Sequence, residues 1–128
     1  MKAAHLQQGA DAELACCDYL QAQGLKLISQ NFRCRLGEID IIMLDSTTLV
    51  FIEVRFRKNT SFGGGLESVT PAKQHKLRKT AELYLQQNKQ YENARFDVVS
   101  MSKNIQTKKS LFSKSWQQYN FDWINNAF

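Results

Sequence analysis

The sequence predicts a single α/β domain in which helices flank a mixed central β-sheet. Three observations support this class: a helical pattern near the N-terminus, three strand-like segments in succession, and a second helical pattern followed by another strand. The predicted order is α-β-β-β-α-β, followed by a tail. With 128 residues, 43% of them hydrophobic, the chain is long enough to bury one core, so we expect residues 1–128 to form one domain.

The first helix is expected over residues 3–23, because Gly24 is a natural C-terminal cap. Its apolar positions alternate in steps of four and three, and Glu13 occupies the position that completes the stripe. Alternatively, Leu14 widens the stripe and leaves Glu13 at its rim. The stripe itself is Leu6, Ala10, Cys17 and Leu20.

Four strands are expected over residues 25–32, 38–44, 49–57 and 94–101, where β-branched and aromatic residues are frequent. The second helix begins with Thr70 as its N-cap and Pro71 at its first position. A polar loop is expected over residues 102–110. The aromatic tail "WQQYNFDWINNAF" predicts a closing strand or a short helix over the core.

Two acidic residues interrupt the apolar strands of the stretch "GEIDIIMLDSTTLVFIEVRFR". With the short polar turn centred between Ser46 and Thr47, an antiparallel hairpin places Asp40 opposite Glu53 and Glu38 opposite Arg55. Directly opposed residues hold their Cβ atoms roughly 4.5–5.5 Å apart, and two carboxylates at that distance repel each other. The pattern therefore favours a divalent cation between Asp40 and Glu53, with Mg²⁺ or Mn²⁺ suited to the oxygen ligands.

The alternative is an ordinary solvent-facing pair of strands with a surface ion pair between Glu38 and Arg55. Leu49, Phe51 and Ile42 lie on the same face as the acids, however, which indicates that this face is covered along most of its length. We therefore expect the acids at the edge of a buried surface, in a cleft.

Charge, hydropathy and cysteine content narrow the range of possible functions further. The net charge is +5, and the segment from Arg55 to Lys79 holds seven cations against one anion, as a phosphate-binding surface requires. A solvated helix face is the alternative explanation of that charge. No apolar run is long enough to span a membrane. Three cysteines, two of them adjacent, favour a reducing cytoplasm over a disulfide framework.

The motifs "GEIDII", "FIEVR" and "RFDVV", in this order and spacing, resemble the YraN-type family within the PD-(D/E)-x-K superfamily. The resemblance covers nearly the whole chain, and it also includes "NFRCRL", "SFGGGLESV" and "INNAF". The superfamily includes restriction endonucleases and archaeal Holliday junction resolvases. The resemblance therefore implies a restriction-endonuclease-like core and metal-dependent cleavage of DNA, including branched DNA.

The resemblance also implies roles by position. Asp40 and Glu53 match the metal-binding acids, and Glu13 matches the helical Glu that junction resolvases add to the metal site. Arg55 occupies the position of the superfamily Lys, a departure that matters because Arg cannot act as a base. Since resolvase-like relatives act as two-fold dimers, a homodimer is implied too.

The hypothesis is thus a Mg²⁺- or Mn²⁺-dependent endonuclease whose catalytic residues are Glu13, Asp40, Glu53 and Arg55. The backbone of the nucleic acid, with DNA favoured, would be gripped by four cations. They are Arg57, Lys73, Lys76 and Arg78. The glycines at 63–65 would let the backbone approach a phosphate. Two alternatives remain: a nucleic-acid-binding module with little or no turnover, and an interaction domain whose partner docks on the aromatic tail.

Overall fold

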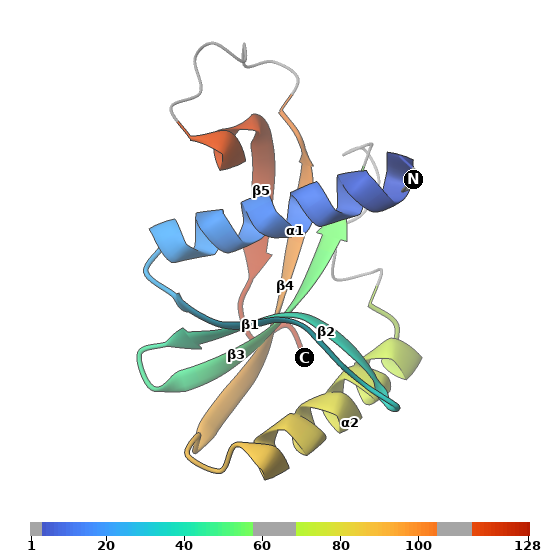
Figure 1. Ribbon diagram of the computed structural model, residues 1–128, viewed down its shortest axis with the longest axis vertical. Helices are drawn as coiled ribbons and strands as arrows, with labels where there is room; N and C mark the ends of the chain where they lie inside the picture. Colours follow the sequence, from blue (N-terminus) through green and yellow to red (C-terminus); the bar gives the residue numbers. More distant parts are fainter. Residues whose placement is uncertain (1–3, 58–68, 105–113) are drawn as a thin grey trace.

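The computed structural model describes residues 4–57, 69–104 and 114–128. Within them, one mixed sheet has the strand order β1-β2-β3-β4-β5, with α1 on one face and α2 on the other (Figure 1). The predicted α/β class is confirmed. The elements are α1 (Ala4–Ala22), β1 (Lys26–Cys34), β2 (Gly37–Asp45), β3 (Thr48–Phe56), α2 (Pro71–Gln87), β4 (Asn93–Lys103), η3 (Ser115–Gln118) and β5 (Tyr119–Ile124).

Helix α1 ends as its sequence predicts. Gly24 adopts a φ of +104°, which a glycine reaches without strain, and the N–H of Leu25 closes the helix by donating to the carbonyl of Leu20. The buried face consists of Ala12, Ala15, Cys16, Cys17 and Leu20. Leu14 is 55% exposed, so the wider stripe is wrong, and Glu13 lies half-buried beside the inward face. The side chain of Leu6 lies outside the described residues.

Strands β1, β2 and β3 form an antiparallel meander. A two-residue turn at Ser46 and Thr47 joins β2 to β3, and the predicted register holds from Asp45–Thr48 to Ile41–Ile52. Strand β1 runs two residues further than predicted, to Cys34, and turns over Arg35 and Leu36 into β2. Pairing with β2 as far as Gly37 accounts for the extra length.

Helix α2 connects β3 to β4, which pair in parallel from Thr48–Asn93 to Phe56–Met101. A parallel pair needs such a crossover. The predicted start is confirmed, because the hydroxyl of Thr70 accepts a hydrogen bond from the backbone N–H of Lys73 at 3.2 Å and Pro71 opens the helix. The glycines at 63–65 lie outside the described residues.

The tail forms both predicted alternatives, the short helix η3 and the closing strand β5, which pairs antiparallel with β4. Its aromatic rings pack on the rest of the molecule. Tyr119 is buried, Phe121 stacks on Tyr19 with the ring centroids 4.0 Å apart, and Phe128 stacks on Phe96 at 4.9 Å. The expected loop starts later than predicted because β4 continues to Lys103, and residues 105–113 lie outside the described residues.

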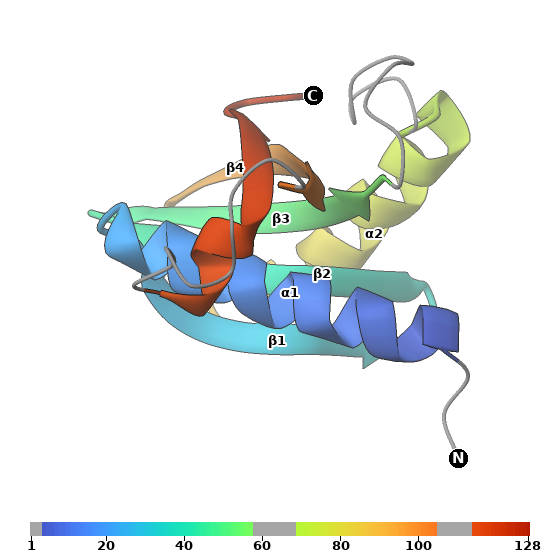
Figure 2. The same ribbon diagram turned by 90° about the horizontal axis from the view of Figure 1, so that it is seen from above.

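Two cores result, one on each face of the sheet. Side chains of β2, β3 and β4 pack against α1 on one face and against α2 on the other. The N-terminal part of α1, the β1–β2 turn, the end of β3 and the start of α2 lie on one side of the molecule, at the right in both views (Figures 1 and 2). In the described part of the chain, neither helix has the length and apolar character needed to cross a bilayer.

Candidate active site

The β2–β3 ladder stops where the two acids begin. Its last pair is Ile41–Ile52, and beyond it the Asp40 carboxylate accepts a hydrogen bond from the backbone N–H of Val54 at 2.9 Å. The predicted direct pairing of Asp40 with Glu53 is therefore wrong, because a side chain takes the place of the backbone acceptor. The predicted pairing of Glu38 with Arg55 is wrong too.

Glu38 instead lies opposite Arg33 of β1. The two residues are ladder partners, and the Arg33 Nε atom is 3.4 Å from the Glu38 carboxylate. Both side chains are largely exposed, so this is a surface ion pair of small energetic value, under about 1 kcal/mol.

At this point the side chains of strand β2 also switch from one face of the sheet to the other. Ile39 and Ile42 both pack in the core on the α2 side, whereas residues three apart in a regular strand point to opposite faces. In β1, Asn31 has a left-handed φ of +54°. The irregularity lets Asp40 interact with Glu13 of α1, which forms side-chain hydrogen bonds with Asn31 and Asp40.

Glu53 belongs to the α2 side. Leu49 and Phe51, on the same face of β3, pack in the α2 core, and Glu53 itself is 7% exposed. Its Oε1 atom lies 3.0 Å from the Lys73 ammonium and 3.5 Å from the Arg55 guanidinium. The buried carboxylate thus has two cationic partners, one from the helix and one from its own strand.

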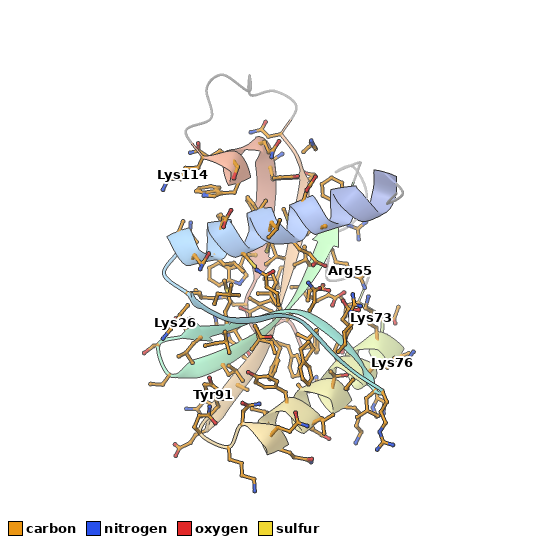
Figure 3. All side chains as sticks on the ribbon, viewed as in Figure 1. Lys26, Arg55, Lys73, Lys76, Tyr91 and Lys114 are labelled. Atoms are coloured by element: carbon orange, nitrogen blue, oxygen red, sulfur yellow. The ribbon has the colours of Figure 1, made fainter. Side chains whose placement is uncertain are left out.

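Asp40 and Glu53 meet in one cavity of about 240 Å³ on the side of the molecule noted above. Figure 3 shows Arg55, Lys73 and Lys76 on that side, with Lys26 and Lys114 on the opposite side. The cavity is lined by Gly37, Glu38, Asp40, Glu53, Lys73, Lys76 and Leu77. Residues of strands β2 and β3 and of helix α2 line the cavity. Glu13 of α1 is not among the lining residues, but its charge acts on Asp40.

The electrostatics of Asp40 distinguish it from an ordinary surface acid. Burial, followed by repulsion from Glu53, raises the pKa of Asp40 to about 8, although the hydrogen bond from Val54 acts in the opposite direction. Burial and the charge of Glu38 also raise the pKa of Glu13, against its hydrogen bonds with Asn31 and Asp40. At neutral pH the metal-free site therefore favours a protonated Asp40, and a bound cation would displace that proton.

A hard divalent cation matches this donor set, because carboxylate oxygens are the ligands that Mg²⁺ and Mn²⁺ prefer. In the part of the chain that the structure describes, no three His, Cys, Asp or Glu side chains are already arranged as a metal-binding group. Glu53 is engaged with Lys73 instead. A cation bound by Glu13, Asp40 and Glu53 would therefore compete with the Lys73 ammonium for the Glu53 carboxylate.

The four predicted phosphate-binding cations have separate surroundings. Lys73 forms an ion pair with Glu53, and Lys76 is an exposed residue that lines the cavity. Arg57 follows β3 directly and is half-buried, with its N–H donating to the carbonyl of Met101 at 2.7 Å. The Arg78 guanidinium lies over two rings of the tail region, 5.7 Å from the centroid of Phe96 and 5.4 Å from that of Phe128.

Two residues that shape the site were not among the predicted ones. Asn31 provides the left-handed position and a hydrogen bond to Glu13. Gly37 lets the β1–β2 turn approach α2, because a Cβ atom there would lie 2.8 Å from the Thr80 hydroxyl. Asn and Gly are the residues that tolerate unusual backbone conformations, so their presence within a strand pattern was the available signal.

Comparison with known proteins identifies the family of this chain. Residues 12–101, which include all four predicted catalytic residues, match the model of the "Uncharacterised protein family UPF0102". A UPF0102 protein of Pseudomonas fluorescens is 42% identical over 126 residues, covering 97% of this chain and 94% of that protein. A UPF0102 protein of Nitrosococcus oceani is 50% identical over 102 residues, covering 78% and 82%. The chain therefore belongs to the UPF0102 family, the YraN-type family that its motifs resemble.

Proposed function

We propose that this protein is a Mg²⁺- or Mn²⁺-dependent phosphodiesterase that cleaves DNA, including branched DNA. The observation that carries the proposal is the convergence of Asp40, Glu53 and Glu13, from three different elements, at the point where the β2–β3 ladder ends. A fold that needed only a stable hairpin would continue the ladder and keep these acids apart, because burying ionised carboxylates together is costly.

Each residue has a distinct role in this proposal. Asp40, Glu53 and Glu13 hold the divalent cation, which when bound supplies positive charge to the scissile phosphate and lowers the pKa of water. Arg55 donates hydrogen bonds to the charge that develops on the phosphate, and it keeps its proton throughout. Lys76, exposed at the cavity lining, contacts the flanking backbone.

A second candidate is a nucleic-acid-binding module with little or no turnover. It is favoured by one observation: Glu53 is already neutralised by Lys73 and Arg55, so the site has charge balance around that acid without a metal. This candidate predicts DNA binding that is sensitive to salt and independent of both Mg²⁺ and Asp40.

The third candidate, an interaction domain, has less support because the rings that suggested it pack on the protein itself. Tyr119 is buried in the α1 core, and the other rings lie partly buried against one of the two cores. These other rings are Trp116, Phe121, Trp123 and Phe128.

The test is cleavage of a labelled four-way junction and of a matched linear duplex in Mn²⁺. Asp40→Asn and Glu53→Gln keep the shape of each side chain and remove its charge, so each is expected to lower the cleavage rate at least about 100-fold. Glu82→Gln is the matched control, because Glu82 is an exposed carboxylate of α2 paired with Lys79.

Equal cleavage by wild type and by the Asp40→Asn, Glu53→Gln double variant would refute the catalytic proposal. Metal-independent binding of the same DNAs by both proteins would then favour the second candidate. Absence of binding at low salt would exclude both nucleic-acid functions.

A further inference from the structure

Lys73 is positioned by the start of α2 and does not lie among the exposed cations that follow it. Its backbone N–H is held by the Thr70 hydroxyl in the first turn, and Pro71 restricts the backbone there. Its side chain is 38% exposed and reaches into the cavity, where the ammonium lies 3.0 Å from Glu53. A long side chain held at both ends loses rotamer freedom, and the close ion pair offsets that cost.

Lys73 and Arg55 share the same oxygen atom, Oε1 of Glu53, but they are chemically different. The Arg55 guanidinium is planar and 3.5 Å away, whereas the Lys73 ammonium is compact and closer. The cavity lining includes Lys73 beside Asp40 and Glu53. Of the two cations paired with Glu53, the closer one is therefore supplied by a helix and not by the strand that carries the Glu-x-Arg motif.

Only part of this arrangement can persist once Glu53 binds a divalent cation. Lys73 contacts Oε1 of Glu53, and a divalent cation on either oxygen of that carboxylate repels the nearby ammonium. The ammonium then binds the carboxylate less tightly, inside a cavity that, under the proposed function, holds a phosphodiester. Phosphate oxygens are the anionic groups that would replace the carboxylate.

We propose that Lys73 acts beside Arg55 as an active-site cation of this protein, which neutralises Glu53 in the metal-free state and contacts the scissile phosphate in the metal-bound state. The inference rests on the proposed function, and it assigns Lys73 to the reacting group instead of to the flanking backbone. In hydrolysis, water attacks phosphorus, the bond to the leaving oxygen breaks, and the water's proton leaves with solvent or the leaving group. Lys73 retains its own protons and stabilises the developing negative charge.

The first test is a Mn²⁺ titration of the protein without DNA. Lys73→Gln removes the competing ammonium, so it is expected to bind Mn²⁺ about 3- to 10-fold more tightly than wild type. Lys79→Gln is the matched control, because Lys79 is a half-exposed lysine of the same helix that pairs with Glu82, and its affinity should equal that of wild type.

The second test is single-turnover cleavage of the four-way junction at saturating Mn²⁺ and protein. Lys73→Gln is expected to lower the maximal rate about 100-fold with little change in the half-saturating concentration, because the lost contact is made in the transition state. Lys73→Arg keeps a charged donor, so it should recover at least about a tenth of the wild-type rate. Circular dichroism and thermal unfolding check that each variant folds.

The outcomes separate this inference from the proposed function. If Asp40→Asn abolishes cleavage while Lys73→Gln cleaves at the wild-type rate, Lys73 is not an active-site cation and the function stands. If wild type itself does not cleave, the Mn²⁺ titration still tests the role of Lys73. An Mn²⁺ affinity of Lys73→Gln equal to that of wild type would refute the competition between Lys73 and the metal for Glu53. Equal losses in Lys73→Arg and Lys73→Gln would refute the charge-donating role.

Discussion

Two aspartates of this protein, one fully buried and one half-buried, have opposite surroundings. Asp97 of β4 is completely buried, and its carboxylate accepts hydrogen bonds from the Arg95 guanidinium, the Trp123 indole and the backbone N–H of Asn126. Its charge is therefore fully compensated, and the residue fastens the tail to the sheet. Asp40 has one backbone donor and the repulsion of its acidic neighbours. Asp97 is a structural residue, whereas Asp40 stores an electrostatic conflict that a ligand can relieve.

This conflict predicts a pH dependence of stability. An unfolded Asp titrates near 3.9, whereas burial and Glu53 raise the pKa of folded Asp40 to about 8. Between these values the folded state binds more protons than the unfolded state, so the contribution of Asp40 to the free energy of unfolding falls as pH rises from about 4 to about 8. Relative to Asp40→Asn, which has no such charge, wild type should lose about 2–4 kcal/mol over this range in the absence of metal.

Urea unfolding of both proteins at pH 5 and pH 8.5 in a chelator measures the difference. If the free energy of unfolding changed equally with pH in both proteins, ionisation of Asp40 would not destabilise the folded state. Millimolar Mg²⁺ at pH 8.5 should recover part of the loss in wild type and none in Asp40→Asn, because a ligand that binds the folded state stabilises it.

At the scale of elements, the β1–β2 turn is held against α2 by close contact. The Thr80 hydroxyl donates to the carbonyl of Lys76 at 2.8 Å, so it has little freedom to move away from Gly37. Gly37 and Lys76 both line the cavity, which means that the packing of turn on helix also sets one wall of the site.

Gly37→Ala should therefore destabilise the fold by about 1–3 kcal/mol, because the new methyl group would overlap the Thr80 hydroxyl. Thr80→Ala removes that oxygen, so the double variant should be more stable than the sum of the single changes indicates. Chemical denaturation of the four proteins of this cycle gives the coupling energy. If the two free-energy changes were strictly additive, the destabilisation by Gly37→Ala would come from the backbone conformation of the turn and not from contact with Thr80.

For the molecule as a whole, the positive charge that binds nucleic acid should act locally, on one side. Lys76 lines the cavity and Lys26 lies on the opposite side, as Figure 3 shows, and both side chains belong to exposed residues. Lys76→Gln is expected to reduce the slope of log affinity against log salt by about 0.9, the value for one phosphate contact with duplex DNA. Lys26→Gln should leave the slope unchanged. Fluorescence anisotropy over a salt series measures both, and equal slopes would indicate diffuse attraction.

Much of the fold followed from local patterns. The order of elements, the cap at Thr70 and the hairpin register up to Ile41–Ile52 depend on neighbouring residues, whose spacing and chemistry are visible in the sequence. The change of facing at Asp40 did not follow, because it arises from competition between a side chain and a backbone carbonyl for one N–H group.

Contacts between distant elements were also hidden. Periodicity places Lys73 and Arg78 on a basic helix, but it does not indicate that one contacts Glu53 and the other lies over Phe96 and Phe128. Such partners are chosen by the packing of the helix on the sheet. The acids of the site were found because buried carboxylates conflict with a strand pattern, whereas a lysine on a helix surface conflicts with nothing.

The hydrogen bond between Asp40 and Val54 has one more consequence. Because this amide proton is bound by an ionisable group and not by a carbonyl, its magnetic environment must respond whenever the carboxylate gains a proton or shares its lone pairs with an incoming ion. A single backbone resonance is thus a built-in reporter for titration of the site, and it works whether or not the protein turns over a substrate.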